Sequence, residues 1–146
     1  MARRATVALH RLRRVVLGVC VLVWLAAMVA THLPPTELPE VRVSDKLLHV
    51  VGFFVLASLL WLSLDAYDVR VRHRIPTILC ISIIYAAVDE TTQGWVRRSP
   101  EVLDWVCDVA GAVIATAIWE GAARLFGAHR VNDATAAPPT YHQFPY

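Results

Sequence analysis

The chain has 146 residues, of which 57% are hydrophobic and only 18% are charged, and its mean hydropathy is +0.50. This composition excludes an ordinary soluble domain and predicts that apolar side chains meet a lipid bilayer. The formal net charge of +2 is small, and the arginines lie beside apolar blocks rather than along an aromatic-interleaved surface, so we expect no nucleic-acid partner.

The apolar residues occur in long blocks, which predicts membrane-spanning helices. Barrel strands would appear as alternating segments of about ten residues. In hydrocarbon, a helix satisfies every backbone N–H and C=O within its own segment. The cysteines have neither CxxC nor Cys/His spacing, so the sequence predicts neither a disulfide framework nor a zinc site.

The first apolar block, residues 15–33, follows the arginine-rich residues 1–14. It is long enough to cross a hydrocarbon core of about 30 Å as a helix. A signal peptide would have a shorter block and a small-residue cleavage site, whereas Met28 stands two positions before Ala30. We therefore expect an uncleaved span.

The second and third blocks differ in how far their apolar residues extend. Residues 47–64 form a block that is interrupted mainly by His49 and Gly52. The third apolar run, residues 75–88, is too short to cross a bilayer by itself. It reaches the required length if its helix continues to residue 95, and the end of that helix then carries carboxyl groups.

The fourth block, residues 102–119, carries Asp104 and Asp108 in its first turns and is apolar beyond them. We expect a fourth span here. Residues 127–146 contain several prolines and no hydrophobic periodicity, so they are predicted to be a disordered tail.

The positive charges indicate an orientation, because short cytoplasmic segments are enriched in lysine and arginine. Most arginines lie before the first span, between the second and third, and after the fourth. We therefore expect an all-α membrane protein, a four-transmembrane-helix bundle with both termini cytoplasmic. Its predicted parts are a basic N-terminus (1–14), the transmembrane domain (15–126) and the cytoplasmic tail (127–146).

Polar residues at the outer ends of three spans form the candidate binding site. In each of these spans two polar residues stand four positions apart and share one helix face, as Asp45 and His49 do. An ionisable group costs on the order of 2.5 to 3.5 kcal/mol at the bilayer centre, so these faces should converge. The predicted outer-leaflet cluster consists of Asp45, Lys46, His49, Asp89, Glu90, Gln93, Arg98, Asp104 and Asp108.

The same residues carry a resemblance to a known family. The runs DKLLHVVGF, DETTQGWVRRSPEVLD and DVAG, in this order, resemble the signature blocks of VanZ-like membrane proteins. The resemblance covers Ser44 to about Gly121. Two features depart from the pattern: Asp108 stands where the family commonly has Asn, and the link from Gln93 to Arg98 is one residue short and lacks the usual Pro-Gly turn.

The resemblance implies a protein of the bacterial cytoplasmic (inner) membrane, from a family associated with low-level resistance to the glycopeptide teicoplanin. An outward-facing polar site would then recognise or shield a cell-envelope component, such as a lipid-linked cell-wall precursor or a lipid headgroup. Arg97 and Arg98 could clamp a phosphate or carboxylate of that component. The sequence leaves open whether the chain forms a homo-oligomer.

Structural interpretations compete with the functional one. His49 could be a buried imidazole that is hydrogen-bonded to Asp45. The cluster could also be an ion-pair network, with Lys46, Arg97 and Arg98, that only fixes helix order. A stripe of small residues in the fourth span predicts close helix packing. These small residues are Gly111, Ala112 and Ala115.

An enzyme is the alternative function. One histidine among carboxylates would suit Mg²⁺ or Mn²⁺, but no metal-ligand spacing is present, so we expect no metal and no cofactor. The hydroxyls of Thr91, Thr92 and Ser99 lie near the cluster without a nucleophile motif. The sequence thus favours a non-catalytic protein over a membrane-embedded enzyme, acid/base or metal-assisted, that acts on a lipid-linked cell-wall precursor.

Overall fold

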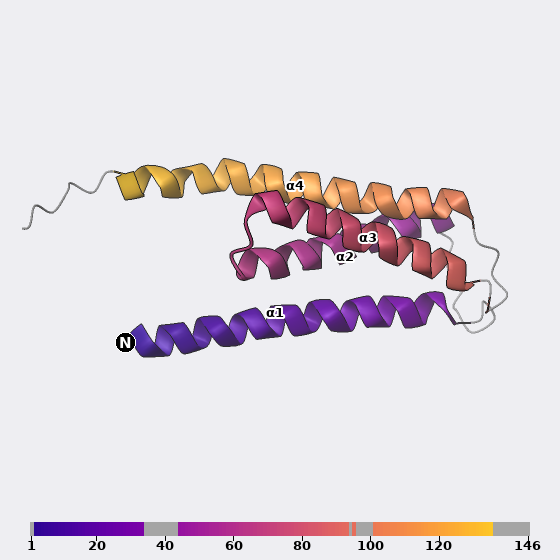
Figure 1. The fold of residues 1–146 in the computed structure, drawn as a ribbon, viewed down its shortest axis with the longest axis horizontal. Helices are drawn as coiled ribbons and strands as arrows, with labels where there is room; N and C mark the ends of the chain where they lie inside the picture. Colours follow the sequence, from indigo (N-terminus) through magenta and orange to yellow (C-terminus); the bar gives the residue numbers. More distant parts are fainter. Residues whose placement is uncertain (1, 34–43, 94, 96–100, 136–146) are drawn as a thin grey trace, which may run out of the picture.

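The computed structural model describes residues 2–33, 44–93, 95 and 101–135, and the side chains of residues 7–33, 44–93, 95 and 101–126. The regular elements of these ranges are helices that run back and forth along one axis (Figure 1). They are α1 (Ala2–Thr31), α2 (Asp45–Ala66), α3 (Val71–Gln93) and α4 (Val102–Thr135).

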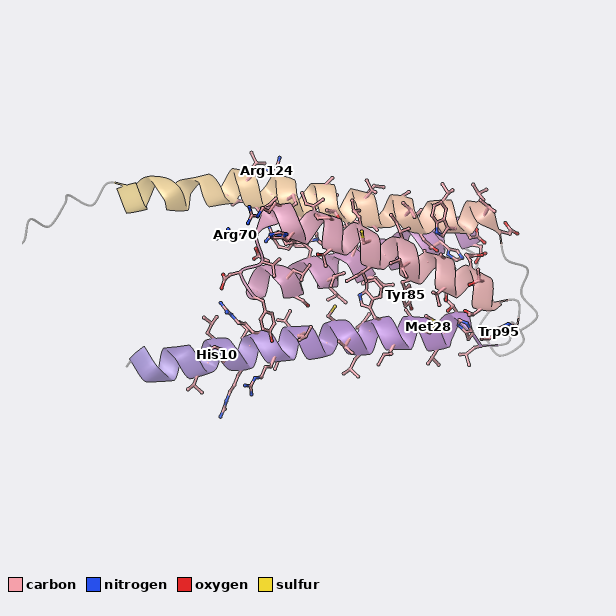
Figure 2. The ribbon with its side chains drawn as sticks, in the orientation of Figure 1. His10, Met28, Arg70, Tyr85, Trp95 and Arg124 are labelled. Atoms are coloured by element: carbon pink, nitrogen blue, oxygen red, sulfur yellow. The ribbon has the colours of Figure 1, made fainter. Side chains whose placement is uncertain are left out.

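The start of α1, the turn between α2 and α3 and the end of α4 lie at the same end of the bundle (Figure 1). We call it the arginine end, because Arg13, Arg70 and Arg124 lie there, the last two labelled in Figure 2. The opposite end, where α2 and α4 begin and α3 finishes, carries Asp45 and Asp104 and is called the carboxylate end.

Each helix contains a segment that is long and apolar enough to cross a membrane. The shortest segment has 22 residues, or about 33 Å of helix. The predicted fold class, an all-α protein of four membrane-spanning helices, is therefore confirmed. As predicted, α3 gains its length by continuing through the carboxyl-bearing turn to Gln93.

Two helices are longer than the apolar blocks indicated. The arginine-rich N-terminal segment belongs to α1, which begins at Ala2. At the other terminus, α4 continues to Thr135, into residues that the sequence predicts to be a disordered tail. The first proline after this helix is Pro138, so nothing in the extension forces the helix to end earlier. The rest of that tail lies outside the described residues.

The closest helix contact is between α2 and α4. A Cβ atom added to Gly111 would collide with the carbonyl oxygen of Val50 and would lie 3.1 Å from the backbone nitrogen of Phe54. Beside this point, Ala112 and Ala115 are buried in a core with Trp61 on α2. The close helix packing predicted for the small-residue stripe is present, and its partner is α2.

The first helix leans against this core and leaves much of its apolar surface open to lipid. Trp24 donates a hydrogen bond from Nε1 to the carbonyl of Leu56, 3.2 Å away. Tyr85 of α3 donates to the carbonyl of Trp24 at 2.9 Å, and the two rings meet edge to face. Leu22 and Leu25 lie on exposed positions of α1. In a bilayer these leucines would contact acyl chains.

A buried ion-pair network connects three helices near the arginine end. Arg74 of α3 donates from Nε to Glu120 of α4 at 2.6 Å and from Nη1 to Asp65 of α2 at 2.6 Å. Trp61 donates to the same Glu120 carboxylate at 2.9 Å, and the Arg74 guanidinium lies 4.6 Å from the Trp61 ring centroid. The side chains of Arg74 and Glu120 are only 6% and 5% exposed, so this pair is part of the core.

Candidate functional site

The carboxylate end brings together polar residues of α2, α3 and α4. His49 lies one turn into α2, Glu90 lies in the last turn of α3, and Asp108 lies in the second turn of α4. The antiparallel course of the helices sets these turns at the same height along the bundle. Their side chains converge instead of facing lipid, since Glu90 and Asp108 are 6% and 0% exposed.

His49 is at the centre of this group. Its Nδ1 lies 2.8 Å from Oδ1 of Asp108, which is a hydrogen bond. Its Nε2 lies 3.8 Å from Asp104 and 3.9 Å from Asp45. The imidazole therefore has carboxylates beside both ring nitrogens. Its short contact is with Asp108 on α4 and not with Asp45, the partner that the structural interpretation of the sequence assigned to it.

Lys46 and two carboxylates of α4 and its N-terminal flank form the rim of the cluster. The Lys46 ammonium donates to Glu101 at 2.9 Å and to Asp104 at 3.0 Å. Glu101 also donates from its backbone N–H to Oε2 of Glu90 at 2.9 Å. The rim is open to the surroundings, because the Glu101 side chain is 56% exposed and that of Lys46 is 39% exposed.

Two carboxylate oxygens in the centre of the cluster lack partners. Within the part of the chain whose side chains are described, neither Oε1 of Glu90 nor Oδ2 of Asp108 has a hydrogen-bond partner, although both atoms are buried. Burying a carboxylate oxygen without a partner is unfavourable. The cluster therefore contains two buried acceptor oxygens that form no hydrogen bond with the described residues.

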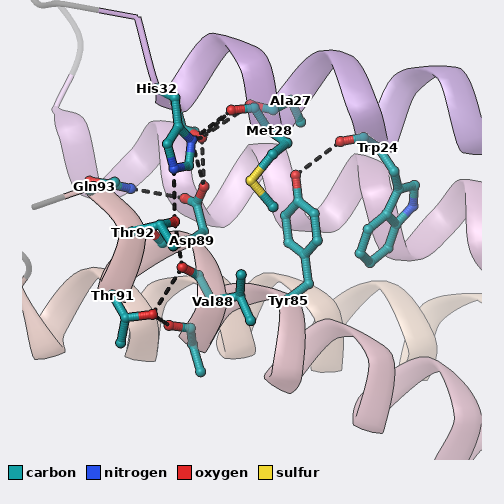
Figure 3. A network of polar contacts seen from close by, with 12 residues as sticks. Trp24, Ala27, Met28, His32, Tyr85, Val88, Asp89, Thr91, Thr92 and Gln93 are labelled. Atoms are coloured by element: carbon teal, nitrogen blue, oxygen red, sulfur yellow. Dashed lines mark hydrogen bonds and ion pairs between the residues drawn. The ribbon is translucent and has the colours of Figure 1, made fainter. Parts of the chain in front are cut away.

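Asp89 and Gln93 belong to a second group, which joins α3 to the end of α1 (Figure 3). Asp89 accepts a hydrogen bond from Thr31 at 2.6 Å and another from Gln93 at 2.9 Å. His32 lies 2.7 Å from the Thr92 hydroxyl through Nε2, and 2.8 Å from the carbonyl of Met28 through Nδ1. Asp89 is 1% exposed, so it faces protein and not lipid.

The structure thus places most of the predicted site residues in two adjoining groups at the same end of the bundle. Arg98, like Arg97 and Ser99, lies outside the described residues. Reasoning from the sequence missed Thr31, His32 and Glu101, which contact the predicted residues. The signal that could have indicated Thr31 and His32 is their position as a polar pair at the end of the first apolar block.

Two overlapping sets of side chains have the composition and spacing of cation ligands. One consists of Asp45, His49 and Asp104, and the other of His49, Glu90 and Asp108. In each set, one ligand atom per residue lies within 4.8 Å of the others. The second set is the more buried and contains both carboxylate oxygens that lack partners.

Comparison with known proteins identifies the family of the chain. Neither the curated proteins nor the solved structures gave a match. The VanZ/LLP1 family model matches residues 8–126, which include all the described carboxylate-end residues and most of the membrane-spanning part. The chain is therefore a multi-pass membrane protein that belongs to the VanZ/LLP1 family.

Proposed function

We propose that this chain is a non-catalytic protein of the bacterial cytoplasmic membrane that recognises a cell-envelope component at its carboxylate end. The observation that carries the proposal is the polar cluster of α2, α3 and α4. It combines a buried centre at His49 and Asp108 with an open rim at Lys46 and Glu101. A purely structural network would not need an exposed rim, since exposed ion pairs contribute about 0 to 1 kcal/mol.

The proposed orientation places the carboxylate end outside the cytoplasm. The charge distribution supports it, because the guanidinium groups of Arg13, Arg70 and Arg124 gather at the opposite end (Figure 2). Short segments rich in arginine stay in the cytoplasm. In this orientation the cluster meets the outer leaflet, where lipid-linked cell-wall precursors expose their headgroups. The family resemblance adds an association with low-level teicoplanin resistance.

The charges of the rim indicate which group of the ligand would bind there. Among the described residues of the carboxylate end, carboxylates outnumber ammonium and guanidinium groups. Asp45 and Glu101 are each 56% exposed, and Asp104 lies between them and His49. Such a surface favours an ammonium group of an envelope component, such as an amine of a precursor peptide. Lys46 would hold the rim carboxylates in place.

A second candidate function, a membrane-embedded enzyme, is favoured by the contacts of Thr92. His32 is positioned by the Met28 carbonyl at Nδ1, and its Nε2 contacts the Thr92 hydroxyl at 2.7 Å. A histidine beside a hydroxyl can activate it as a nucleophile. However, the Thr92 hydroxyl has one proton, and the carbonyl of Val88, 2.7 Å away, competes with His32 for it. The recognition function is therefore the better supported.

Binding of a lipid-linked cell-wall precursor and teicoplanin susceptibility test the proposal together. The full chain in detergent should bind the precursor, and its expression in a susceptible Gram-positive host should raise the inhibitory concentration of teicoplanin. Glu101→Gln should lower both at an unchanged protein level, because it removes an exposed rim charge without changing side-chain shape. Asp68→Asn is the matched control, since Asp68 pairs with Arg13 at the arginine end.

Three results would contradict this function. Absence of precursor binding by the wild-type chain would refute recognition of this ligand. Equal binding by the wild type and Glu101→Gln would remove the rim from the site. Release of a cleaved precursor, abolished by Thr92→Val, would support the enzyme instead.

A further inference from the structure

The buried centre of the polar cluster holds two carboxyl groups beside a histidine. Glu90 and Asp108 lie beside His49, and both carboxyl groups are buried. Oε1 of Glu90 and Oδ2 of Asp108 have no hydrogen-bond partner among the described side chains. Lys46 contacts Glu101 and Asp104 at the rim rather than this pair. Two ionised carboxylates in a membrane interior are costly without a compensating positive charge.

We propose that His49, Glu90 and Asp108 bind a divalent cation of the Mn²⁺ type. The three residues each offer one ligand atom, and these atoms lie within 4.8 Å of one another. An octahedral cation with bonds of about 2.1 Å separates its ligand atoms by about 3 to 4.2 Å. Binding would draw the ligand atoms from this spacing into that range. The cation would neutralise both buried carboxylates and use the oxygens that lack partners.

The surroundings of His49 support its role as a ligand. A metal-bound imidazole donates its other ring N–H to an outer carboxylate, which fixes the orientation of the ring. If Nδ1 binds the cation, the ring proton is on Nε2, and Nε2 faces Asp104 at 3.8 Å and Asp45 at 3.9 Å. These residues, on α4 and α2, would thus orient the imidazole. Asp108, beside Nδ1, would then be a cation ligand, whereas Asp104 and Asp45, beside Nε2, would orient the ring.

The ligand atoms also favour one class of cation. Zn²⁺ sites are built mostly from sulfur and several histidine nitrogens, and Mg²⁺ prefers oxygen ligands and water. One imidazole nitrogen with two carboxylates lies between these preferences and suits Mn²⁺. Cation binding does not depend on the proposed recognition of an envelope component, because the cation ligands are buried, whereas the open rim is formed by Lys46 and Glu101.

Titration of the purified full chain with Mn²⁺ tests the inference without any envelope component. After treatment with a chelator, bound Mn²⁺ is measured in detergent from the loss of the free-ion electron paramagnetic resonance signal. Glu90→Gln and Asp108→Asn should each weaken binding at least tenfold, because each removes a ligand charge at nearly constant shape. Asp68→Asn, which changes a carboxylate at the arginine end, should leave the affinity within twofold of wild type.

Thermal unfolding provides a second measurement on the same proteins. Mn²⁺ should raise the Tm of the wild type and of Asp68→Asn, and should leave that of Glu90→Gln unchanged. If Glu90→Gln does not fold, Asp108→Asn gives the same comparison. No Mn²⁺ binding by the wild type at millimolar concentration, or equal affinity in Glu90→Gln, Asp108→Asn and the wild type, would overturn the inference. Either result would leave precursor recognition at the rim to be judged by its own assay.

Discussion

Gly111→Ala should destabilise the bundle, because Gly111 sits where α4 meets the backbone of α2. The added Cβ would lie 3.0 Å from the carbonyl carbon of Val50 and 3.1 Å from the nitrogen of Phe54, and closer still to the Val50 oxygen. Favourable contacts between carbon atoms need about 3.5 to 4.0 Å. Backbone atoms cannot rotate away as a side chain would, so α2 and α4 must move apart.

The expected magnitude follows from comparison with a second glycine of the same helix. Overpacking in a core costs about 1 to 3 kcal/mol. Replacing glycine by alanine inside a helix gains about 0.8 to 1.0 kcal/mol. Gly121 has no atom within 4 Å of its added Cβ, so Gly121→Ala should show only the gain. The two variants should therefore differ by about 1 to 3 kcal/mol in free energy of unfolding.

The assay is unfolding of the full chain in detergent, followed by circular dichroism under identical conditions for each variant. Gly18 of α1 also has open space around its added Cβ, so Gly18→Ala is a control in another helix. The reasoning would be refuted if Gly111→Ala were as stable as Gly121→Ala. A larger side chain should increase the effect, with Gly111→Leu less stable than Gly111→Ala.

Two further predictions concern the Arg74 ion pair and the orientation of the bundle. Arg74→Met should lower the free energy of unfolding by about 3 to 5 kcal/mol, because it leaves Glu120 buried without its charge partner. The double variant Arg74→Met, Glu120→Leu should recover much of that loss, and urea unfolding that shows additive losses would contradict the buried pair. A reporter that is active only outside the cytoplasm should be silent when fused after Asp68 and active within residues 94–100. The reverse pattern would invert the proposed orientation.

Much of the fold could be predicted because it depends on local properties of the chain. Length and hydropathy indicate the spans, since a bilayer of about 30 Å sets the length of a helix that crosses it. The extension of α3 to Gln93 followed from the same requirement. Membrane depth and i, i+4 spacing indicated which turns carry the polar residues, because both depend on the helical rise and period alone.

The pairing of side chains between helices depends on how each helix is rotated about its axis, which local sequence does not specify. His49 could be assigned to Asp45 from spacing, yet its short contact is with Asp108 on another helix. Arg74 has the sequence features of an exposed loop arginine, and only the packing of α3 against α4 places it on Glu120.

The sequence by itself thus determined a membrane protein of four helices with a polar turn at one end of three of them. The tertiary structure decided how these polar groups pair, and it brought Thr31 of α1 and the adjoining His32 to the same end. It also left the oxygens of Glu90 and Asp108 buried without partners among the described residues. The physical reason is that hydropathy depends on the residues of a single helix. Hydrogen bonds and ion pairs between helices depend on how several helices are rotated and how closely they approach.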